Sequence, residues 1–256
     1  MGYNGTTGLP TIDYRIVDSI TDPPGSDDLE TERLIRLDGC FLCYTPPHHA
    51  PPISLRPDDQ PIVFGSFNTM LKIGPPVAAL WARVLRAVPG SRLIIKNPTL
   101  GNADTASACR QLFAREGVVH PALQLRGPTP GRAEHMAMYA DIDIALDPFP
   151  YNGTTTTLES LWMGVPVVNL VGDRHCARAG RSLLTHAGLS ELSADTPDDY
   201  IRIAAQLAAD HARRRGLRTS LRESVRTALC DAPSFTRRIE AAYRQMWRDW
   251  CRSRRG

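Results

Sequence analysis

One stretch of the sequence combines a glycine with four consecutive hydroxyl residues, Asn152-Gly-Thr-Thr-Thr-Thr157. A strand-compatible run at 141–147 precedes it, and apolar residues at helical spacing follow it: Leu158, Leu161, Trp162 and Val165. The first N–H groups of a helix have no intrahelical acceptor, and the helix dipole favours negative charge beside them. Threonine hydroxyls add further donors. The pattern therefore predicts a phosphate-binding site at a helix start.

A simpler alternative remains open for this stretch. Asn-Gly-Thr is also typical of a turn, and threonine is a common helix cap, so the bare pattern favours a purely structural role. Three other residues bear on the choice. Glu159, one turn into the helix, could reach a ribose, and Lys72 is either a phosphate partner or a surface lysine. His135 is either a structural histidine or a ring that stacks on a base or donates to a phosphate.

These residues need a scaffold, and the chain from residue 61 onward supplies a regular one. Strands are expected at 61–67, 91–96, 123–125, 142–146 and 165–171. Helices are expected at 75–88, 103–116, 132–140, 154–163, 177–187, 197–215 and 217–228, with a last one from about 234. This alternation predicts an α/β fold with an open parallel Rossmann-like sheet and flanking helices. Ligands of such sheets lie outside the C-terminal strand ends, where the loops named above fall.

The first 60 residues have a different character. They are rich in glycine and proline, and only 12–16 and 39–44 are expected as short strands. We therefore divide the chain into 1–60, which lacks a sheet of its own, and 61–256. Cys40-Phe-Leu-Cys43 invites a metal or redox interpretation, but no second Cys or His pair stands at zinc-ligand spacing, which favours a structural role.

Composition excludes several classes of function. The 256 residues are 42% hydrophobic and 22% charged, as in an ordinary globular protein. The net charge of +3 is small and local, in Arg213-Arg-Arg215 and the tail 252–255, which argues against a nucleic-acid partner. No run resembles a signal peptide or membrane span, so we expect a cytoplasmic protein without a membrane partner. A Rossmann-type NAD enzyme is disfavoured because no G-x-G-x-x-G follows the first expected strand.

Five motifs together resemble the O-GlcNAc transferase/SPINDLY family in order and approximate spacing. They are Gly2-Tyr-Asn-Gly-Thr-Thr-Gly8, Phe67-Asn-Thr-Met-Leu-Lys-Ile73, Glu134-His135, the stretch from Asp147 to Pro166, and Tyr243-Arg-Gln-Met-Trp247. The resemblance covers nearly the whole chain. It implies the C-terminal lobe of a glycosyltransferase-B fold, in which two Rossmann-like lobes close on a nucleotide sugar.

The activity implied by this resemblance is transfer of N-acetylglucosamine from UDP-GlcNAc to protein Ser or Thr hydroxyls, with inversion and without a metal or cofactor. A nucleotide-sugar donor and a protein or peptide acceptor are the implied partners. Lys72 would pair with the diphosphate and stabilise the leaving group, Thr155 and Thr156 would bind phosphate, His135 would contact the uracil, and Glu159 would hold the ribose. The remaining donor-site residues are Thr69, Arg132, Asn152, Gly153 and Thr154, with Gly5 and Thr6 on a sugar-side loop.

The sequence departs from the family pattern at three of these positions. The animal enzymes have Asp where Glu159 stands, His where Thr154 stands and Gln where Thr69 stands. The first change keeps a ribose acceptor, whereas the other two remove donors to uracil, phosphate or sugar. A SPINDLY-type transfer of fucose from GDP-fucose is therefore an alternative.

The family's tetratricopeptide region and most of its first lobe would precede the Gly2–Gly8 loop. We therefore expect the chain to be a C-terminal piece, from a truncated or split gene or a mis-called start, in which 1–60 is the tail of the first lobe and a linker. The closing helix, with Tyr243 and Trp247, is then expected to expose an apolar face. A separate chain would supply the missing lobe. The alternative is a non-catalytic remnant that only binds a nucleotide sugar.

Overall fold

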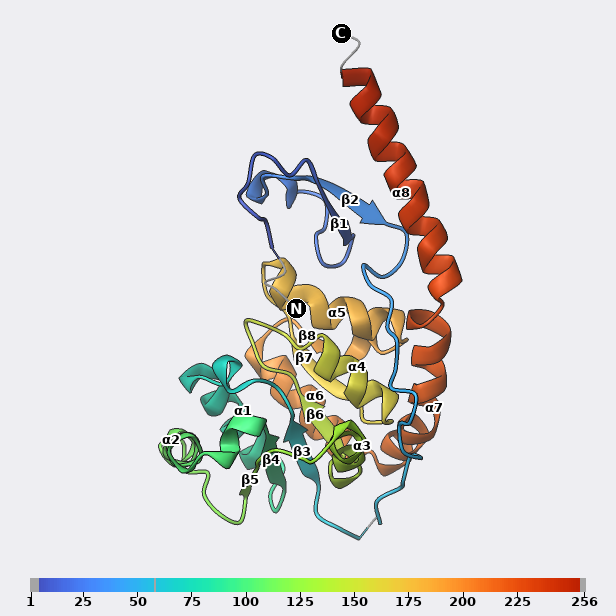
Figure 1. The fold of residues 1–256 in the computed structure, drawn as a ribbon. Coiled ribbons are helices and arrows are strands. Elements are labelled where there is room, and N and C mark those ends of the chain that lie inside the picture. The colour runs from blue at the N-terminus through green and yellow to red at the C-terminus, as the bar shows by residue number, and fades with distance from the viewer. Residues whose placement is uncertain (1–4, 58, 254–256) are drawn as a thin grey trace.

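A six-stranded parallel sheet forms the centre of the chain (Figure 1), in the computed structural model that describes residues 5–57 and 59–253. The strand order is β5-β4-β3-β6-β7-β8. The strands are β3 Val63–Ser66, β4 Arg92–Lys96, β5 Leu123–Arg126, β6 Ile144–Leu146, β7 Val167–Leu170 and β8 Ser193–Ala194. The chain builds outward from β3 on one side, then returns to β6 and builds outward on the other. The strand order therefore reverses between β3 and β6, the place where open α/β sheets bind ligands.

Helices connect the strands and pack in two groups. The helices are α1 Pro75–Ala87, α2 Ala103–Ala114, α3 Arg132–Ala137, α4 Thr155–Trp162, α5 His175–His186, α6 Pro197–Ala209, α7 His211–Leu229 and α8 Ala232–Ser253. Helix α1 contacts α2 and α6, whereas α4 contacts α5 and α7. Right-handed crossovers that run in opposite directions from the centre place their helices on opposite faces of a sheet. The architecture confirms the predicted α/β class.

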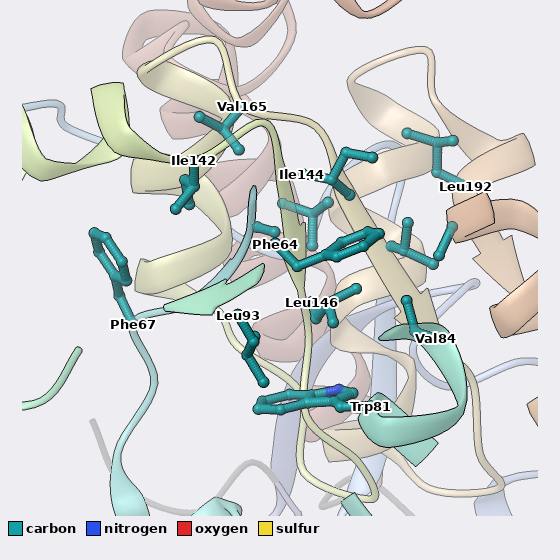
Figure 2. Packing of buried hydrophobic residues seen from close by; sticks show 14 of the residues in the cluster. Phe64, Phe67, Trp81, Val84, Leu93, Ile142, Ile144, Leu146, Val165 and Leu192 are labelled. Carbon is teal, nitrogen blue, oxygen red and sulfur yellow. The ribbon is translucent and has the colours of Figure 1, made fainter. Parts of the chain in front are cut away.

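The core lies between the sheet and these helices (Figure 2). Phe64 of β3 and Leu146 of β6 are completely or almost completely buried, and Trp81 of α1 packs near them. The Trp81 indole N–H donates to the Tyr200 hydroxyl at 3.2 Å, and that hydroxyl donates to the Asp147 carbonyl at 3.2 Å. The polar tips of two core aromatic residues are therefore satisfied at the strand end from which the predicted site begins.

The predicted elements from residue 61 onward agree with the structure to within a few residues at most boundaries. Gly164 has φ +75°, a left-handed conformation that glycine adopts readily, and it follows the end of α4 as expected. The short edge strand β8 was not predicted, because a two-residue strand has no recognisable alternation. The expected helix at 197–215 is divided at Asp210, whose carboxylate accepts from the Arg213 N–H at 2.9 Å and caps α7.

The segment before residue 61 differs more from the prediction. It contains a two-stranded parallel sheet of β1 Tyr14–Asp18 and β2 Arg33–Leu37. The predicted strand at 39–44 is wrong, because its backbone groups bond elsewhere. The Phe41 N–H donates to the Asp18 carboxylate at 2.9 Å, and the Tyr44 N–H donates to the Leu229 carbonyl at the end of α7 at 2.7 Å. This segment therefore packs against the end of α7, and its described residues add no strand to the central sheet.

The last helix, α8, extends away from the sheet domain beside β2 (Figure 1). The Arg33 guanidinium of β2 lies 3.2 Å from the Asp249 carboxylate of α8. On this helix Tyr243 is 58% exposed and Trp247 is 63% exposed, so it carries the predicted exposed apolar face. Over the described ranges 5–57 and 59–253, no helix is both long and apolar enough to cross a membrane.

Candidate functional site

The loops that follow β3, β4 and β6 are tied together at the C-terminal edge of the sheet. The Thr156 hydroxyl at the start of α4 donates to Asn68 Oδ1 after β3, at 2.9 Å. Asn97 Nδ2 after β4 donates to the Asn68 carbonyl at 3.2 Å. Lys72 Nζ donates to the Asn152 carbonyl after β6 at 2.7 Å. The structure therefore brings Lys72 and the start of α4 together across the switch point.

The start of α4 leaves hydrogen-bond donors unused. Thr154 is the N-cap residue and its side chain makes no capping bond. Within the part of the chain that the structure describes, the hydroxyls of Thr154 and Thr155 have no hydrogen-bond partner, and both residues are partly exposed. Free N–H groups, free hydroxyls and the positive end of the helix dipole therefore face outward together, as an anion requires.

Lys72 supplies a cation beside this helix start. It is the last residue of the 3₁₀ turn Met70–Lys72, and its ammonium lies 4.0 Å from the centroid of the Tyr151 ring. Burial lowers the pKa of Lys72, and the nearby charge of Asp147 opposes that change. A half-buried ammonium has little water around it, so it gains more from a phosphate partner than an exposed one does.

Asp147 lies beneath the loop and is almost completely buried. Burial raises the pKa of its carboxyl to about 7, although the Gly153 N–H, which donates to Oδ1 at 2.8 Å, and the charge of Lys72 both act to lower it. Asn169 Nδ2 donates to the other oxygen at 3.3 Å. The carboxyl thus holds the backbone of the Gly153 loop in place from inside the fold.

A second cluster lies beside the first and contains His135, Glu159, Arg132 and Lys96. His135 Nδ1 is 2.7 Å from Lys96 Nζ, and His135 Nε2 is 3.2 Å from a Glu159 carboxylate oxygen. Arg132 reaches the other Glu159 oxygen at 3.5 Å, and its side chain is largely exposed. Burial lowers the pKa of Lys96, with the charge of Glu159 opposing. The cluster joins the first through Tyr139, whose hydroxyl donates to the Thr156 carbonyl at 3.4 Å.

The remaining predicted site residues are placed differently. Thr69 is exposed at the start of the 3₁₀ turn that ends in Lys72. The Asn152 side chain is buried and occupied: Nδ2 donates to the carbonyls of Pro148 and Leu170 at 3.2 and 3.3 Å, and Oδ1 accepts from the Gly180 N–H. Asn152 therefore faces the site with its backbone, through the carbonyl that binds Lys72.

Gly5 and Thr6 belong to the N-terminal segment. The Thr6 hydroxyl is within hydrogen-bond distance of Thr31 and Glu32, at 2.8 and 2.7 Å. Over the described residues, no hydrogen bond joins this loop to the start of α4. The first residues of the predicted Gly2–Gly8 motif, up to residue 4, lie outside the described residues.

Three residues that the structure places in or under the candidate site were not predicted from the sequence. Lys96 is the last residue of β4, Asn68 follows β3 closely, and Asp147 follows β6 directly. The sequence contains a signal for all three: each is a polar residue that ends or follows an apolar strand, and in a parallel sheet this position lies at the ligand-binding edge. Their partners come from other strands, however, and these could not be identified from spacing.

A candidate metal cluster lies away from these loops. Ligand atoms of Asp18, Cys40 and His186 lie within 4.8 Å of one another. Hydrogen bonds already account for the Asp18 carboxylate, which accepts from two nearby N–H groups on one oxygen and from the Phe41 N–H and the Ser182 hydroxyl on the other. Burial also raises the pKa of the Cys40 thiol to about 11. We assign this cluster to holding the N-terminal segment on α5.

Gly153→Ala is expected to destabilise the chain by about 2 kcal/mol, because an added methyl group overpacks the loop. A Cβ at this position would lie 2.6 Å from the Thr156 hydroxyl and 2.7 Å from an Asp147 oxygen. Urea denaturation measures the change in unfolding free energy. Gly216→Ala in α7 is the control, since its Cβ would meet nothing within 4 Å, and alanine is expected to be neutral or stabilising there. Equal stability of both variants would contradict the packing described for the Gly153 loop.

Comparison with known proteins gives matches over nearly the whole chain. The profile of glycosyl transferase family 41 matches residues 54–239. A Petunia hybrida protein named as a probable UDP-N-acetylglucosamine–peptide N-acetylglucosaminyltransferase SPINDLY is 45% identical over 98% of this chain. An Arabidopsis thaliana relative named as the corresponding probable transferase SEC is 28% identical over 98% of this chain. The chain spans 27% and 26% of these two relatives, respectively.

A solved structure of a Thermobaculum terrenum O-GlcNAc transferase mutant is also similar to this chain. Its TM-score is 0.91 and its sequence is 43% identical. The match covers 98% of this chain and 48% of that one. The likeness therefore extends over the N-terminal segment as well as the sheet domain.

Proposed function

The chain belongs to glycosyl transferase family 41, and from this premise we propose that it forms the donor-binding lobe of a transferase that moves N-acetylglucosamine from UDP-GlcNAc to Ser or Thr hydroxyls of proteins. The observation that carries the proposal is the position of Lys72. Its ammonium lies at the switch point of a doubly wound sheet, bonded to the loop that leads into the start of α4. A cation, free hydroxyls and free N–H groups lie together there, and these are the groups that bind a diphosphate.

The chemistry assigned to these residues concerns the leaving group. As the acceptor oxygen attacks the anomeric carbon, the bond from that carbon to the diphosphate breaks and negative charge grows on UDP. Lys72, already held by the Asn152 carbonyl, stabilises that charge together with the hydroxyls of Thr154 and Thr155. Lys72 is held in place before the reaction, so little reorganisation of this cation is needed. In this proposal Lys72 provides the positive charge that a metal ion provides in other glycosyltransferases, and the reaction inverts the anomeric centre.

The nucleoside is assigned to the second cluster. Glu159 lies one turn into α4 and is mostly buried, and His135 and Arg132 hold its carboxylate in place; we assign the ribose hydroxyls to this carboxylate. His135 presents its ring beside Phe67 and Tyr139, with centroids 5.8 Å from each. The His135 side chain is 18% exposed, and we assign the contact with the base to this exposed part of the ring. Arg132 is the exposed member of the cluster, so its side chain is free to move toward a bound ligand.

A second candidate donor is a GDP-sugar such as GDP-fucose. The chain is 45% identical to a relative named SPINDLY but 28% identical to the one named SEC. It also has Glu159 at the position where the animal O-GlcNAc transferases have Asp. Both donors place a diphosphate beside Lys72 and differ only in base and sugar. The chain spans about a quarter of these relatives. We therefore also propose, rather than observe, a protein acceptor and an opposing lobe, which a separate chain or the same chain supplies.

Nucleotide binding tests the proposed function without requiring the opposing lobe. We expect saturating UDP and UDP-GlcNAc to stabilise the chain against thermal unfolding, by about 2.7 kcal/mol at a ligand concentration of 100 Kd. GDP and GDP-fucose, measured in parallel, decide between the two donors, and AMP is the control for unspecific phosphate binding. If none of the four nucleotides stabilises the folded chain beyond AMP, the proposal is overturned.

A further inference from the structure

Lys96 is an unusual residue in this chain. The sequence has 30 basic residues that are Lys or Arg, and only Lys72 and Lys96 are lysines. Both stand at the C-terminal edge of the sheet, Lys72 after β3 and Lys96 as the last residue of β4. Lys96 is only 4% exposed, and a buried ammonium is costly unless it has a partner. Its partner is the imidazole of His135, with 2.7 Å between Nζ and Nδ1.

The chemistry of this contact fixes the histidine proton. An ammonium has three donors and no acceptor, so His135 Nδ1 accepts in this bond. The ring proton is then on Nε2, which lies 3.2 Å from the Glu159 carboxylate and donates to it. The same carboxylate lies 3.5 Å from Arg132 through its other oxygen. A directed chain of hydrogen bonds therefore runs from Lys96 through His135 to Glu159.

The polar contacts of the His135 ring with described residues are the hydrogen bonds to Lys96 and Glu159, and its other neighbours are aromatic. Phe67, after β3, and Tyr139, after α3, pack against the ring with centroids 5.8 Å away, and the Tyr139 contact is edge-on. The charged groups that approach the ring are Lys96 from β4 and Glu159 from α4. The ring therefore owes its orientation to packing against Phe67 and Tyr139 and to one polar partner at each nitrogen.

We propose that Lys96 is a positioning residue of the donor site, which holds His135 as the Nε2–H tautomer and thereby sets both the base contact of His135 and the ribose contact of Glu159. The proposal rests on the proposed function, since it assigns Lys96 to the same nucleotide site. Without Lys96, the proton of His135 is free to move to Nδ1. Nε2 would then present a lone pair to a carboxylate, and the two groups would turn apart.

The test uses Lys96→Met, which keeps the length of the side chain and removes its charge and donors. Nitrogen-15 NMR of the histidine rings in the folded, ligand-free chain reports the tautomer, with the His135 signals assigned through a His135→Gln variant. We expect Nδ1 of His135 to be the unprotonated nitrogen in the wild type and to become at least partly protonated in Lys96→Met. UDP affinity, or GDP affinity if GDP is the better ligand, is expected to fall about tenfold.

Two controls separate positioning from general damage. Lys96→Arg keeps a donor-only cation and is expected to preserve the tautomer and most of the affinity. Arg92→Met removes a cation from the opposite end of the same strand and is expected to change neither. The inference is overturned if Lys96→Met leaves the His135 tautomer unchanged, or if the tautomer changes while nucleotide affinity stays within twofold. Failure of the wild type to bind any nucleotide would instead overturn the proposed function and with it the role of Lys96 in that site.

Discussion

Replacing Lys72 with methionine is expected to weaken UDP binding by about 100-fold, which corresponds to about 2.7 kcal/mol. The reason is the half-buried setting of the ammonium, which has the Asn152 carbonyl at 2.7 Å and the Tyr151 ring beside it but forms no ion pair with any residue that the structure describes. A diphosphate would supply that charge in a place where water screens it little. In an active enzyme that contains this lobe, the loss of transfer rate is expected to be larger, on the order of 100- to 1,000-fold, because charge grows on the leaving group during reaction.

Isothermal titration calorimetry with UDP measures the binding part of this prediction. The matched control is Arg83→Met, which removes a cation from α1, the helix that follows the Lys72 turn, where the guanidinium pairs with Asp198 at the surface. We expect wild-type affinity from the control. An unchanged dissociation constant in Lys72→Met would remove Lys72 from the site, whatever the other residues do.

The wild type is expected to lose about 4 kcal/mol of unfolding free energy through Asp147 as the pH rises from about 4 to about 7, and Asp147→Asn is expected to remove this loss. The Asp147 carboxyl has a pKa of about 7 in the folded chain, raised by burial from 3.8. Between these values the folded chain keeps a proton that the unfolded chain has lost, so the contribution of Asp147 to stability is complete below about pH 4 and is lost as the pH rises through about 7. A difference of about 3 pKa units corresponds to about 4 kcal/mol.

The surroundings of Asp147 can accept a protonated carboxyl if the Asn169 amide turns over. Asn169 Oδ1 is buried without a hydrogen-bond partner, and its amide nitrogen faces an Asp147 oxygen at 3.3 Å. An amide turned by 180° would offer that oxygen to the Asp147 O–H, and an asparagine at 147 would make the equivalent bond through its NH₂ group.

Urea denaturation of wild type and Asp147→Asn from pH 4.5 to 8 measures the effect. The difference in unfolding free energy between the two is the informative quantity, since every other titrating group contributes to both. We expect wild type to lose stability relative to the variant as the pH rises. A difference that is constant with pH would contradict a raised pKa at Asp147.

The fold of residues 61–253 was predictable because its local signals are mutually consistent. Apolar runs of strand length alternate with amphipathic helices, and Gly164 and Pro166 mark the end of α4 and the approach to β7. The N-terminal segment was less predictable. Its strand β2, Arg33–Leu37, contains two arginines, and the apolar run at 39–44 has its backbone bonded to a carboxylate and to the end of α7. The conformations of both stretches depend on contacts with residues distant in the sequence, and no local pattern reveals such contacts.

Part of the candidate site was predictable, because one motif places its hydroxyl residues at a helix start. The helix start follows from the sequence alone. Of the two predicted phosphate ligands, Thr155 has a free hydroxyl among the described residues, whereas the Thr156 hydroxyl donates to Asn68. Pairings across strands were not predictable. Lys96 meets His135 only because β4 ends beside α3, and Asn152 uses its side chain to fasten the loop, although the motif suggests a ligand contact. The roles of these residues toward a nucleotide remain predictions.

The most direct measurement is a map of UDP on the folded chain by backbone amide NMR. We predict chemical-shift changes concentrated in three places at the C-terminal edge of the sheet: Asn68–Ile73 after β3, Gly153–Thr156 at the start of α4, and the residues around His135 on α3. The pocket between α2 and β5, lined by Arg110 and Arg126, provides an internal comparison and is expected to stay unchanged. Shifts confined to that pocket or to α8, or no shifts at saturating UDP and GDP, would contradict a nucleotide-sugar site at the switch point.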